Sequence, residues 1–203
     1  MEEKEKLNDI KVILVGEPGT GKTCLINVAT GRDFIENSES TIISTYITKT
    51  IVKDNCEYYL NLWDTAGQEK YRSMTKIFTK NSNIVIFVYA INNKQTFDEM
   101  KSYWVKTIKE SLGDEPILGI VGNKNDLYIK EEIKEEEGRN FANEIGAKFK
   151  LVTAKEDPNG FISFLEELLD EFLSKKGIDV QKNDNINISK DTEKQISKKK
   201  KCC

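Results

Sequence analysis

Residues 16–23 read GEPGTGKT, which fits the pattern G-x-x-x-x-G-K-[ST]. Glycines allow successive backbone N–H groups to converge on a polyphosphate without Cβ clashes, and a helix that begins here adds the positive end of its dipole. We expect Lys22 to neutralise the outer phosphates. We expect the Thr23 hydroxyl to bind Mg²⁺, which keeps water and phosphate oxygens as its other ligands. The run therefore predicts a phosphate-binding loop.

A second polar run, residues 64–68 (DTAGQ), follows an apolar stretch that ends at Trp63. An aspartate at the end of such a strand is where a Walker-B carboxylate holds Mg²⁺, directly or through water. Gly67 would allow a backbone N–H group to meet a terminal phosphate, and Gln68 could orient an attacking water. This run predicts the metal-binding and hydrolytic side of the same site.

A third polar run, residues 123–126 (NKND), follows the apolar stretch 116–122. Open α/β sheets bind ligands at the carboxyl ends of their strands. Asp126 at this edge would accept two hydrogen bonds from guanine, which has an N1–H and an exocyclic amino group. Adenine offers no such donor pair, so the run favours a guanine nucleotide.

The elements that must position these runs alternate between apolar strands and amphipathic helices. Strands with two buried faces are typical of a parallel sheet covered by helices. The sequence therefore predicts an α/β fold of the P-loop NTPase type, a mostly parallel central sheet with one antiparallel hairpin strand and helices on both faces. Strands are expected at 10–15, 45–52, 57–63, 83–91, 116–122 and 148–152, and helices at 22–30, 95–111, 131–145 and 160–174. The apolar stripe of the last helix is expected to be core.

Composition limits the classes of protein that this chain could belong to. Its 203 residues suit one well-buried domain with an appendage. A net charge of −3 argues against nucleic-acid binding driven by overall charge, and the lack of histidine excludes imidazole chemistry. The four cysteines have no disulfide or zinc spacing, and no signal peptide, myristoylation site or membrane span is expected. These features predict a reducing, cytosolic setting.

Three segments are expected along the chain. Residues 1–8 form a short N-terminal extension, residues 9–174 form the nucleotide-binding domain, and residues 175–203 form a flexible tail. The tail is rich in lysine, asparagine and aspartate and has no aromatic residue, so it cannot bury enough surface to order itself.

In order and spacing, these residues resemble the small GTPases of the Ras superfamily, and the Rab branch most closely, over residues 11–173. The resemblance implies a monomeric switch that binds GTP or GDP with Mg²⁺. It would hydrolyse GTP slowly unless a partner accelerates it, and recruit effectors on membranes in vesicle trafficking. The implied partners are an exchange factor, an activating protein and the prenylation machinery, with no nucleic acid. The implied location is the cytoplasmic face of an intracellular membrane, with a soluble cytosolic pool.

The same resemblance assigns roles to individual residues. Gln68 and Lys22 become the catalytic residues, and Phe34 packs against the guanine edge. Thr41 gives Mg²⁺ a second hydroxyl, and the Ala154 N–H group reads the guanine carbonyl oxygen. The metal ligands are Thr23, Thr41 and Asp64. The other nucleotide-binding residues are Glu17, Gly19, Thr20, Gly21, Cys24, Gly67, Asn123, Lys124, Asp126, Thr153 and Lys155.

Three aromatic residues, Tyr46, Trp63 and Phe78, match those that Rab proteins present to effectors, although ordinary packing explains them equally well. The sequence departs from the family pattern at residues 43–46 (ISTY) and 77–81 (IFTKN), both on the expected partner surface. Pro18 replaces a glycine of Ras proteins beside the γ-phosphate and has no N–H group to donate. Nucleotide chemistry therefore transfers from the family, whereas effector identity does not.

Residues 198–203 read KKKKCC. Rab proteins commonly end in paired cysteines that receive geranylgeranyl groups, so Cys202 and Cys203 are the expected lipidation sites. Two lipid chains, or one with a polybasic run, are what stable anchoring needs. A solvated basic tail with two reactive thiols is the alternative. For the whole chain the alternatives are a GTP-binding module with little or no hydrolysis, and a P-loop phosphotransferase that acts on a small acceptor.

Overall fold

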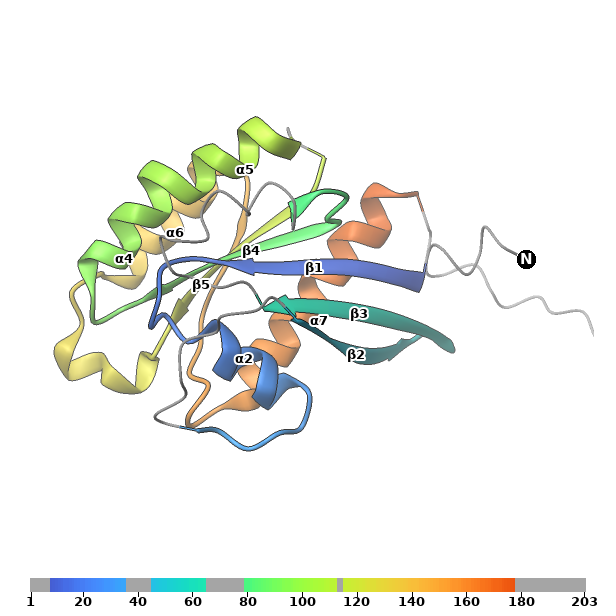
Figure 1. Cartoon of the computed structure of the whole chain (residues 1–203), viewed down its shortest axis with the longest axis horizontal. Helices are drawn as coiled ribbons and strands as arrows, with labels where there is room; N and C mark the ends of the chain where they lie inside the picture. The colour runs from blue at the N-terminus through green and yellow to red at the C-terminus, as the bar shows by residue number, and fades with distance from the viewer. Residues whose placement is uncertain (1–7, 36–44, 65–78, 113–114, 178–203) are drawn as a thin grey trace, which may run out of the picture.

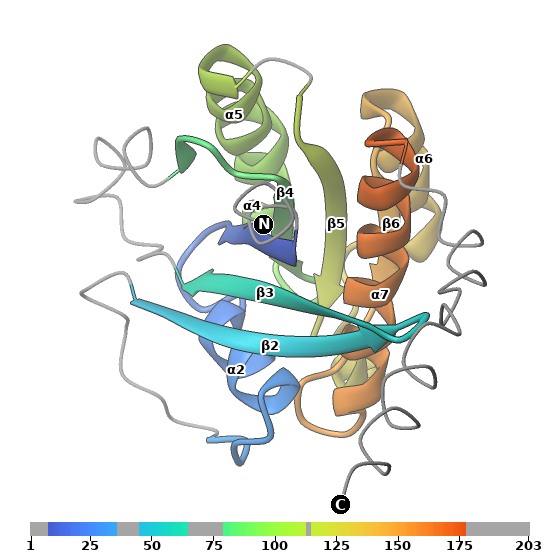
Figure 2. The same ribbon diagram turned by 90° about the vertical axis from the view of Figure 1, so that its right-hand side faces the viewer.

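Six strands form one sheet in the order β2-β3-β1-β4-β5-β6 (Figure 1). The computed structural model describes residues 8–35, 45–64, 79–112 and 115–177. All neighbouring strands are parallel except β2 and β3, which form an antiparallel pair at one edge (Figure 2). The strands are β1 Asp9–Val15, β2 Thr45–Lys53, β3 Cys56–Asp64, β4 Ile84–Ala90, β5 Ile117–Asn123 and β6 Lys148–Leu151. The predicted fold class and hairpin are confirmed.

The hairpin turn explains the register of β2 and β3. Lys53 pairs with Cys56, so the loop contains only Asp54 and Asn55. Both residues have positive φ angles, 49° and 59°. Two-residue turns with positive φ match the right-handed twist of paired strands, and aspartate and asparagine tolerate that conformation better than most residues.

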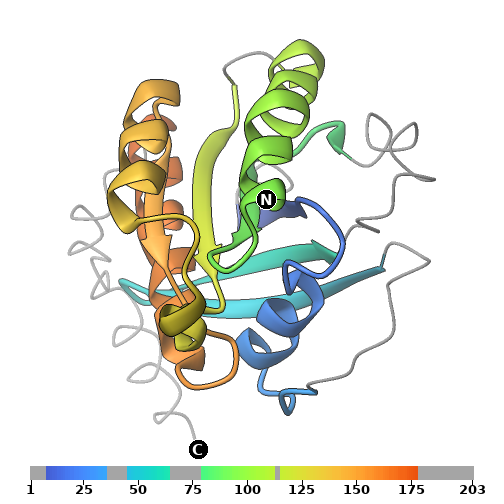
Figure 3. The same ribbon diagram turned by 90° about the vertical axis from the view of Figure 1, so that its left-hand side faces the viewer.

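Helices cover both faces of the sheet, because alternate residues of its central strands enter two separate apolar clusters. Val12 and Leu14 of β1 pack with α2 and α7, whereas Ile13 and Val15 pack with the helices of the opposite face. Period-two alternation produces this division. Figure 3 shows α2 and α5 on different sides of the sheet. The helical segments are α2 Lys22–Ala29, α4 Lys94–Glu99, η2 Met100–Trp104, α5 Val105–Leu112, η3 Asn125–Lys130, α6 Glu135–Ile145 and α7 Pro158–Lys175.

Two helices differ from their predicted form. The run expected as one helix over 95–111 contains η2, a five-residue π-helix, between α4 and α5. The helix expected over 131–145 begins only at Glu135. The N–H groups of Glu132 and Ile133 donate to the Ile91 carbonyl at 2.8 and 3.2 Å, and Ile133 is fully buried. These tertiary contacts hold the segment out of helical geometry.

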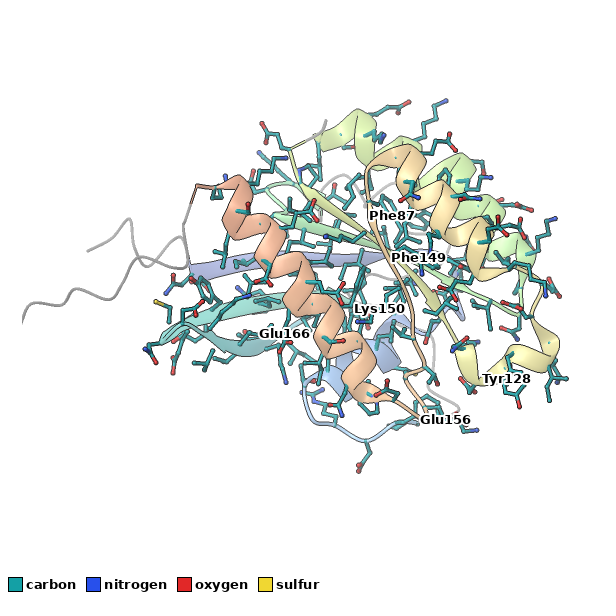
Figure 4. All side chains as sticks on the ribbon, turned by 180° about the vertical axis from the view of Figure 1, so that it is seen from behind. Phe87, Tyr128, Phe149, Lys150, Glu156 and Glu166 are labelled. Atoms are coloured by element: carbon teal, nitrogen blue, oxygen red, sulfur yellow. The ribbon has the colours of Figure 1, made fainter. Side chains whose placement is uncertain are left out.

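The apolar stripe of α7 is core, as expected, and its buried residues are Phe161, Phe164, Leu165, Leu168, Leu169, Phe172 and Leu173. On the polar side, Lys150 of β6, which Figure 4 labels, donates to Ser163 Oγ and Glu167 Oε1, both at 2.7 Å. These bonds fix the last strand to α7. No helix in the described part of the chain is both long and apolar enough to cross a membrane.

Parallel pairing brings the carboxyl ends of β1, β3, β4 and β5 to one edge of the sheet. The chain enters the segment 16–23 from β1, reaches Asp64 at the end of β3, and enters the segment 123–126 from β5. The topology therefore places the three polar runs at one edge.

Candidate functional site

The phosphate-binding loop, residues 16–23, joins β1 to α2, and two of its glycines have no room for a side chain. A Cβ atom on Gly16 would lie 2.1 Å from the Val88 carbonyl oxygen. A Cβ atom on Gly21 would lie 2.3 Å from Asn123 Nδ2, and Gly21 has a φ of 92°. The loop thus lies closely against β4 and the end of β5, and α2 begins within it, at Lys22.

Lys22, in the first turn of α2, turns back over this loop. Its Nζ atom donates to the carbonyl oxygens of Gly16 at 2.8 Å and Glu17 at 3.0 Å. Burial lowers the pKa of Lys22 to about 8, while the nearby Asp64 and Glu17 carboxylates act in the opposite direction. The ammonium group is thus buried inside the loop, where anionic oxygens would restore its preference for the charged form.

Thr23 and Asp64 meet at the carboxyl edge although 41 residues separate them. Thr23 Oγ1 donates to Asp64 Oδ2 at 2.8 Å. A hydroxyl and a buried carboxylate are the hard oxygen ligands that Mg²⁺ prefers, and the ion completes its shell with water and phosphate oxygens. These two residues fit a magnesium site. The third expected ligand, Thr41, lies outside the described residues.

Three loops are joined on the other side of the site by Asn123. Its Nδ2 atom donates to the Thr20 carbonyl at 2.8 Å, and its Oδ1 atom accepts from the Ala154 N–H group at 3.4 Å. Asn123 is 2% exposed, so these contacts satisfy a buried amide. The expected base-binding segments thus contact the phosphate-binding loop directly.

The hydroxyl of Thr153 organises the loop after β6. It donates to Asp126 Oδ1 at 2.7 Å and accepts from the N–H groups of Lys155 and Glu156, both at 3.3 Å. Lys124 has a left-handed φ of 65°, which turns the chain sharply between β5 and Asp126. Figure 4 labels Tyr128 and Glu156, which mark the segments that follow β5 and β6. The Asp126 carboxylate, in the segment after β5, is thus held by the Thr153 hydroxyl, in the segment after β6.

The remaining residues expected at the site differ in burial, and some lie outside the described ranges. Phe34 is half-buried and packs against the cluster beneath α2, and Cys24 Sγ lies 3.7 Å from the Ile35 carbonyl oxygen. Gly19 and Lys155 are exposed. Several expected residues lie outside the described ranges: Thr41, Gly67, Gln68, Phe78, Cys202 and Cys203.

One contact at the site was not predicted from the sequence. Trp104 Nε1 donates to Glu17 Oε1 at 2.9 Å, across 87 residues. Trp104 is 1% exposed and lies at the end of η2. No spacing pattern connects a helical tryptophan with a glutamate of a glycine-rich loop, so the sequence carried no signal for this pair.

Two of the three aromatic residues expected at a partner surface are stacked. The rings of Tyr46 and Trp63 lie 5.0 Å apart between centroids at 27°. Tyr46 is 55% exposed, and Lys11 Nζ lies 4.8 Å from the centroid of the Trp63 ring. The pair presents an aromatic surface beside the end of β3.

Comparisons with known proteins agree with this architecture. The Ras family model matches residues 11–173. The chain is 35% identical over 179 residues to Ras-related protein Rab-12 of Homo sapiens, an alignment that covers 88% of this chain and 72% of Rab-12. It is 32% identical over 197 residues to Ras-related protein SEC4 of Saccharomyces cerevisiae, covering 96% and 91%. Over 196 residues it is 32% identical to Ras-related protein RabC of Dictyostelium discoideum, covering 95% and 96%.

Proposed function

The chain belongs to the Ras family as a Rab-like small GTPase, a guanine-nucleotide-binding GTP hydrolase of vesicle trafficking, and we propose which of its residues bind the nucleotide and respond to GTP hydrolysis. The observation that carries the proposal is the pairing of Thr23 with Asp64 beside the buried Lys22. A hydroxyl, a carboxylate and an ammonium group at the end of one glycine-rich loop suit a nucleotide polyphosphate with its metal ion.

The phosphate end of the nucleotide would be held by this chain's own groups. Lys22 and the N–H groups of the phosphate-binding loop would neutralise the outer phosphates. Thr23, Thr41 and Asp64 would hold Mg²⁺, which supplies charge neutralisation to the phosphate oxygens when bound. Gly67 would donate its N–H group to the γ-phosphate, and Gln68 would orient the attacking water. Loss of the γ-phosphate would then break the contacts that hold the segments containing Thr41 and Gly67, and effectors would sense the change in these segments.

The base end would be read by Asp126 and Ala154. Asp126 would accept the N1–H and amino groups of guanine, with its orientation fixed by Thr153. The Ala154 N–H group would donate to the guanine carbonyl oxygen. Asn123 supports both ends, because it contacts the phosphate-binding loop and the segment after β6.

Single-turnover hydrolysis of GTP by the full chain tests this proposal. We expect a rate well below the order of 1 s⁻¹, because phosphoryl transfer depends on charge stabilisation that an activating protein supplies. Gln68→Leu should slow hydrolysis by roughly tenfold or more, because leucine cannot orient the attacking water. Gln95→Leu, the same substitution at an exposed site on α4, should leave the rate unchanged.

The outcome also separates the alternatives. Equal rates for the wild type and Gln68→Leu would favour a GTP-binding module with little hydrolysis. Transfer of phosphate to an added nucleoside monophosphate would favour a phosphotransferase.

We also propose that residues 9–174 form the switch domain and that Cys202 and Cys203, outside the described residues, receive prenyl groups. The chain would then act as a monomer on the cytoplasmic face of an intracellular membrane and keep a soluble pool. Tyr46, Trp63 and Phe78 would contact effectors. An exchange factor, an activating protein and the prenylation machinery would be its other partners.

A further inference from the structure

The phosphate-binding loop is connected to the helical layer through Glu17. The Glu17 carboxylate accepts a 2.9 Å hydrogen bond from the indole N–H group of Trp104. Trp104 packs among the apolar residues beneath α4, α5 and α6, on the sheet face opposite α2. The Glu17 side chain is thus bound to the helical layer on one face of the sheet, whereas α2, which follows the loop, lies on the other face.

The local form of the helix directs this contact. Trp104 is the last residue of η2, the π-helical segment between α4 and α5. A π-helical turn shifts the residues that follow it around the helix relative to regular α-geometry, and such segments are frequent at functional sites. The indole ring is essentially fully buried, so its position is set by packing. A fixed donor therefore faces the loop.

The backbone of Glu17 is the centre of the loop's own hydrogen bonds. Its carbonyl oxygen accepts from Thr20 Oγ1 at 2.9 Å and from Lys22 Nζ at 3.0 Å. It also accepts from the Thr20 N–H group at 3.4 Å. The orientation of Glu17 thus affects the lysine expected to meet the phosphates.

The Glu17 side chain anchors the phosphate-binding loop to the helical layer, because its carboxylate accepts the hydrogen bond of the Trp104 indole. A hydrogen bond from a buried neutral donor holds this carboxylate toward the helical layer without adding a competing cation. We propose that Trp104 is a positioning residue of the nucleotide site, which acts through Glu17 to fix the loop that holds Lys22. The proposal rests on nucleotide binding at this loop.

A double-mutant cycle on the full chain tests the proposal, with the dissociation rate of fluorescent GDP in Mg²⁺ as the readout. Trp104→Phe keeps an aromatic ring and removes the N–H donor, and Glu17→Ala removes the acceptor. Each should speed dissociation about fivefold, at the low end of typical coupling between sites. Because the two residues act through one bond, the double variant should also be about fivefold faster. Independent effects would multiply to about 25-fold, and that result would overturn the proposal.

Two controls separate positioning from packing. Phe97→Leu removes buried aromatic surface from the same cluster; it should lower the melting temperature and leave GDP dissociation unchanged. Glu17→Gln keeps an acceptor oxygen for the indole and should restore slow dissociation relative to Glu17→Ala. A Trp104→Phe variant that melts earlier but releases GDP at the wild-type rate would show a purely structural tryptophan.

The contact itself has a spectroscopic readout that does not depend on nucleotide. The chain has two tryptophans, so Trp63→Phe assigns the two indole N–H resonances. Glu17→Ala should shift the Trp104 resonance, whereas Glu110→Ala, at an exposed site on α5, should not. An unmoved resonance would overturn the contact. Failure of the proposed function would be seen separately, as no binding of fluorescent GDP by the wild type.

Discussion

Thr153 Oγ1 donates a 2.7 Å hydrogen bond to Asp126 Oδ1 and so joins the segment after β6 to the segment after β5. The same hydroxyl accepts from two N–H groups of its own loop, those of Lys155 and Glu156. Thr153 is 8% exposed, so these bonds form largely away from water. The carboxylate proposed to read guanine is therefore oriented before any ligand arrives.

Removal of the Thr153 hydroxyl should weaken guanine-nucleotide binding. Thr153→Val keeps the shape of the side chain and loses three hydrogen bonds, so we expect the Kd for GDP to rise about tenfold, as for loss of one bond to a charged group. Thr153→Ser keeps the hydroxyl and should bind almost as the wild type does. Competition with fluorescent GDP measures both, and equal affinities for the two variants would contradict the role given to this hydroxyl.

Asp126→Asn should change the preferred base. An asparagine still accepts the N1–H group but its amide would face the guanine amino group, so two donors would oppose each other. We expect the GDP affinity to fall by at least about 100-fold, since a site built for hydrogen bonds strongly rejects a mismatched partner. Xanthine carries an oxygen in place of that amino group. Xanthosine diphosphate should therefore bind the variant better than the wild type, and unchanged base preference would refute the assignment.

Substitution of Asp64 should abolish the dependence of GDP release on Mg²⁺. In the wild type, chelation of Mg²⁺ should speed GDP release by roughly tenfold or more, because the ion links the protein to the phosphates. Asp64→Ala should release GDP quickly with or without the chelator. Asp98→Asn, at an exposed position on α4, should behave as the wild type does. A full chelator response in Asp64→Ala would exclude this carboxylate from the metal site.

Nucleotide binding should take up a proton above pH 8. Burial lowers the pKa of Lys22 from its ordinary value of 10.5 to about 8. Phosphate oxygens favour the charged ammonium, so binding raises this pKa again. GDP affinity should therefore fall as the pH rises from 8 toward 10.5. Calorimetry of nucleotide-free protein in two buffers of different ionisation enthalpy counts the protons; equal uptake at pH 7 and pH 8.5 would contradict the assignment to Lys22.

Gly138 of α6 should not tolerate alanine, although alanine is the better helix former. An added Cβ atom would lie 2.6 Å from both the Tyr89 hydroxyl and a ring carbon of Phe149. We expect Gly138→Ala to lower the free energy of unfolding by about 1–3 kcal/mol, as overpacking typically does. The buried Tyr89 hydroxyl has no hydrogen-bond partner among the described residues. Adding Tyr89→Phe should therefore recover part of the loss in chemical denaturation, and full additivity would argue against the clash.

The sequence predicted the strands and the three polar runs because each depends on local pattern. The apolar runs 10–15 and 116–122 suffice to predict β1 and β5, and the alternation of residues 45–52 suffices to predict the hairpin. The start of α6 was wrong because residues 131–134 are good helix formers by composition. Their conformation is decided by Ile133, which is buried in the core, and by backbone bonds to Ile91. Tertiary contacts overrode propensity there.

At the site, the residue types were predictable and the supporting contacts were not. Lys22, Thr23 and Asp126 stand out in the sequence because their motifs have fixed spacing. The Trp104–Glu17 bond depends on a π-helical turn and on strand order, and neither leaves a periodic pattern. The doubled role of Asn123, as a link between the phosphate and base sides, likewise exists only in three dimensions.

The central place of β1 in the sheet has a consequence for local stability. β1 is hydrogen-bonded on both edges, to β3 and β4, and Val12–Val15 are fully buried. Amide hydrogens of these residues should exchange with deuterium only when the whole domain unfolds, whereas those of the edge strand β2 should exchange through smaller openings. The strand that leads into the phosphate-binding loop is thus expected to be among the slowest-exchanging strands of the sheet, together with β4, which is also paired on both edges and fully buried, so the loop is attached to a rigid base.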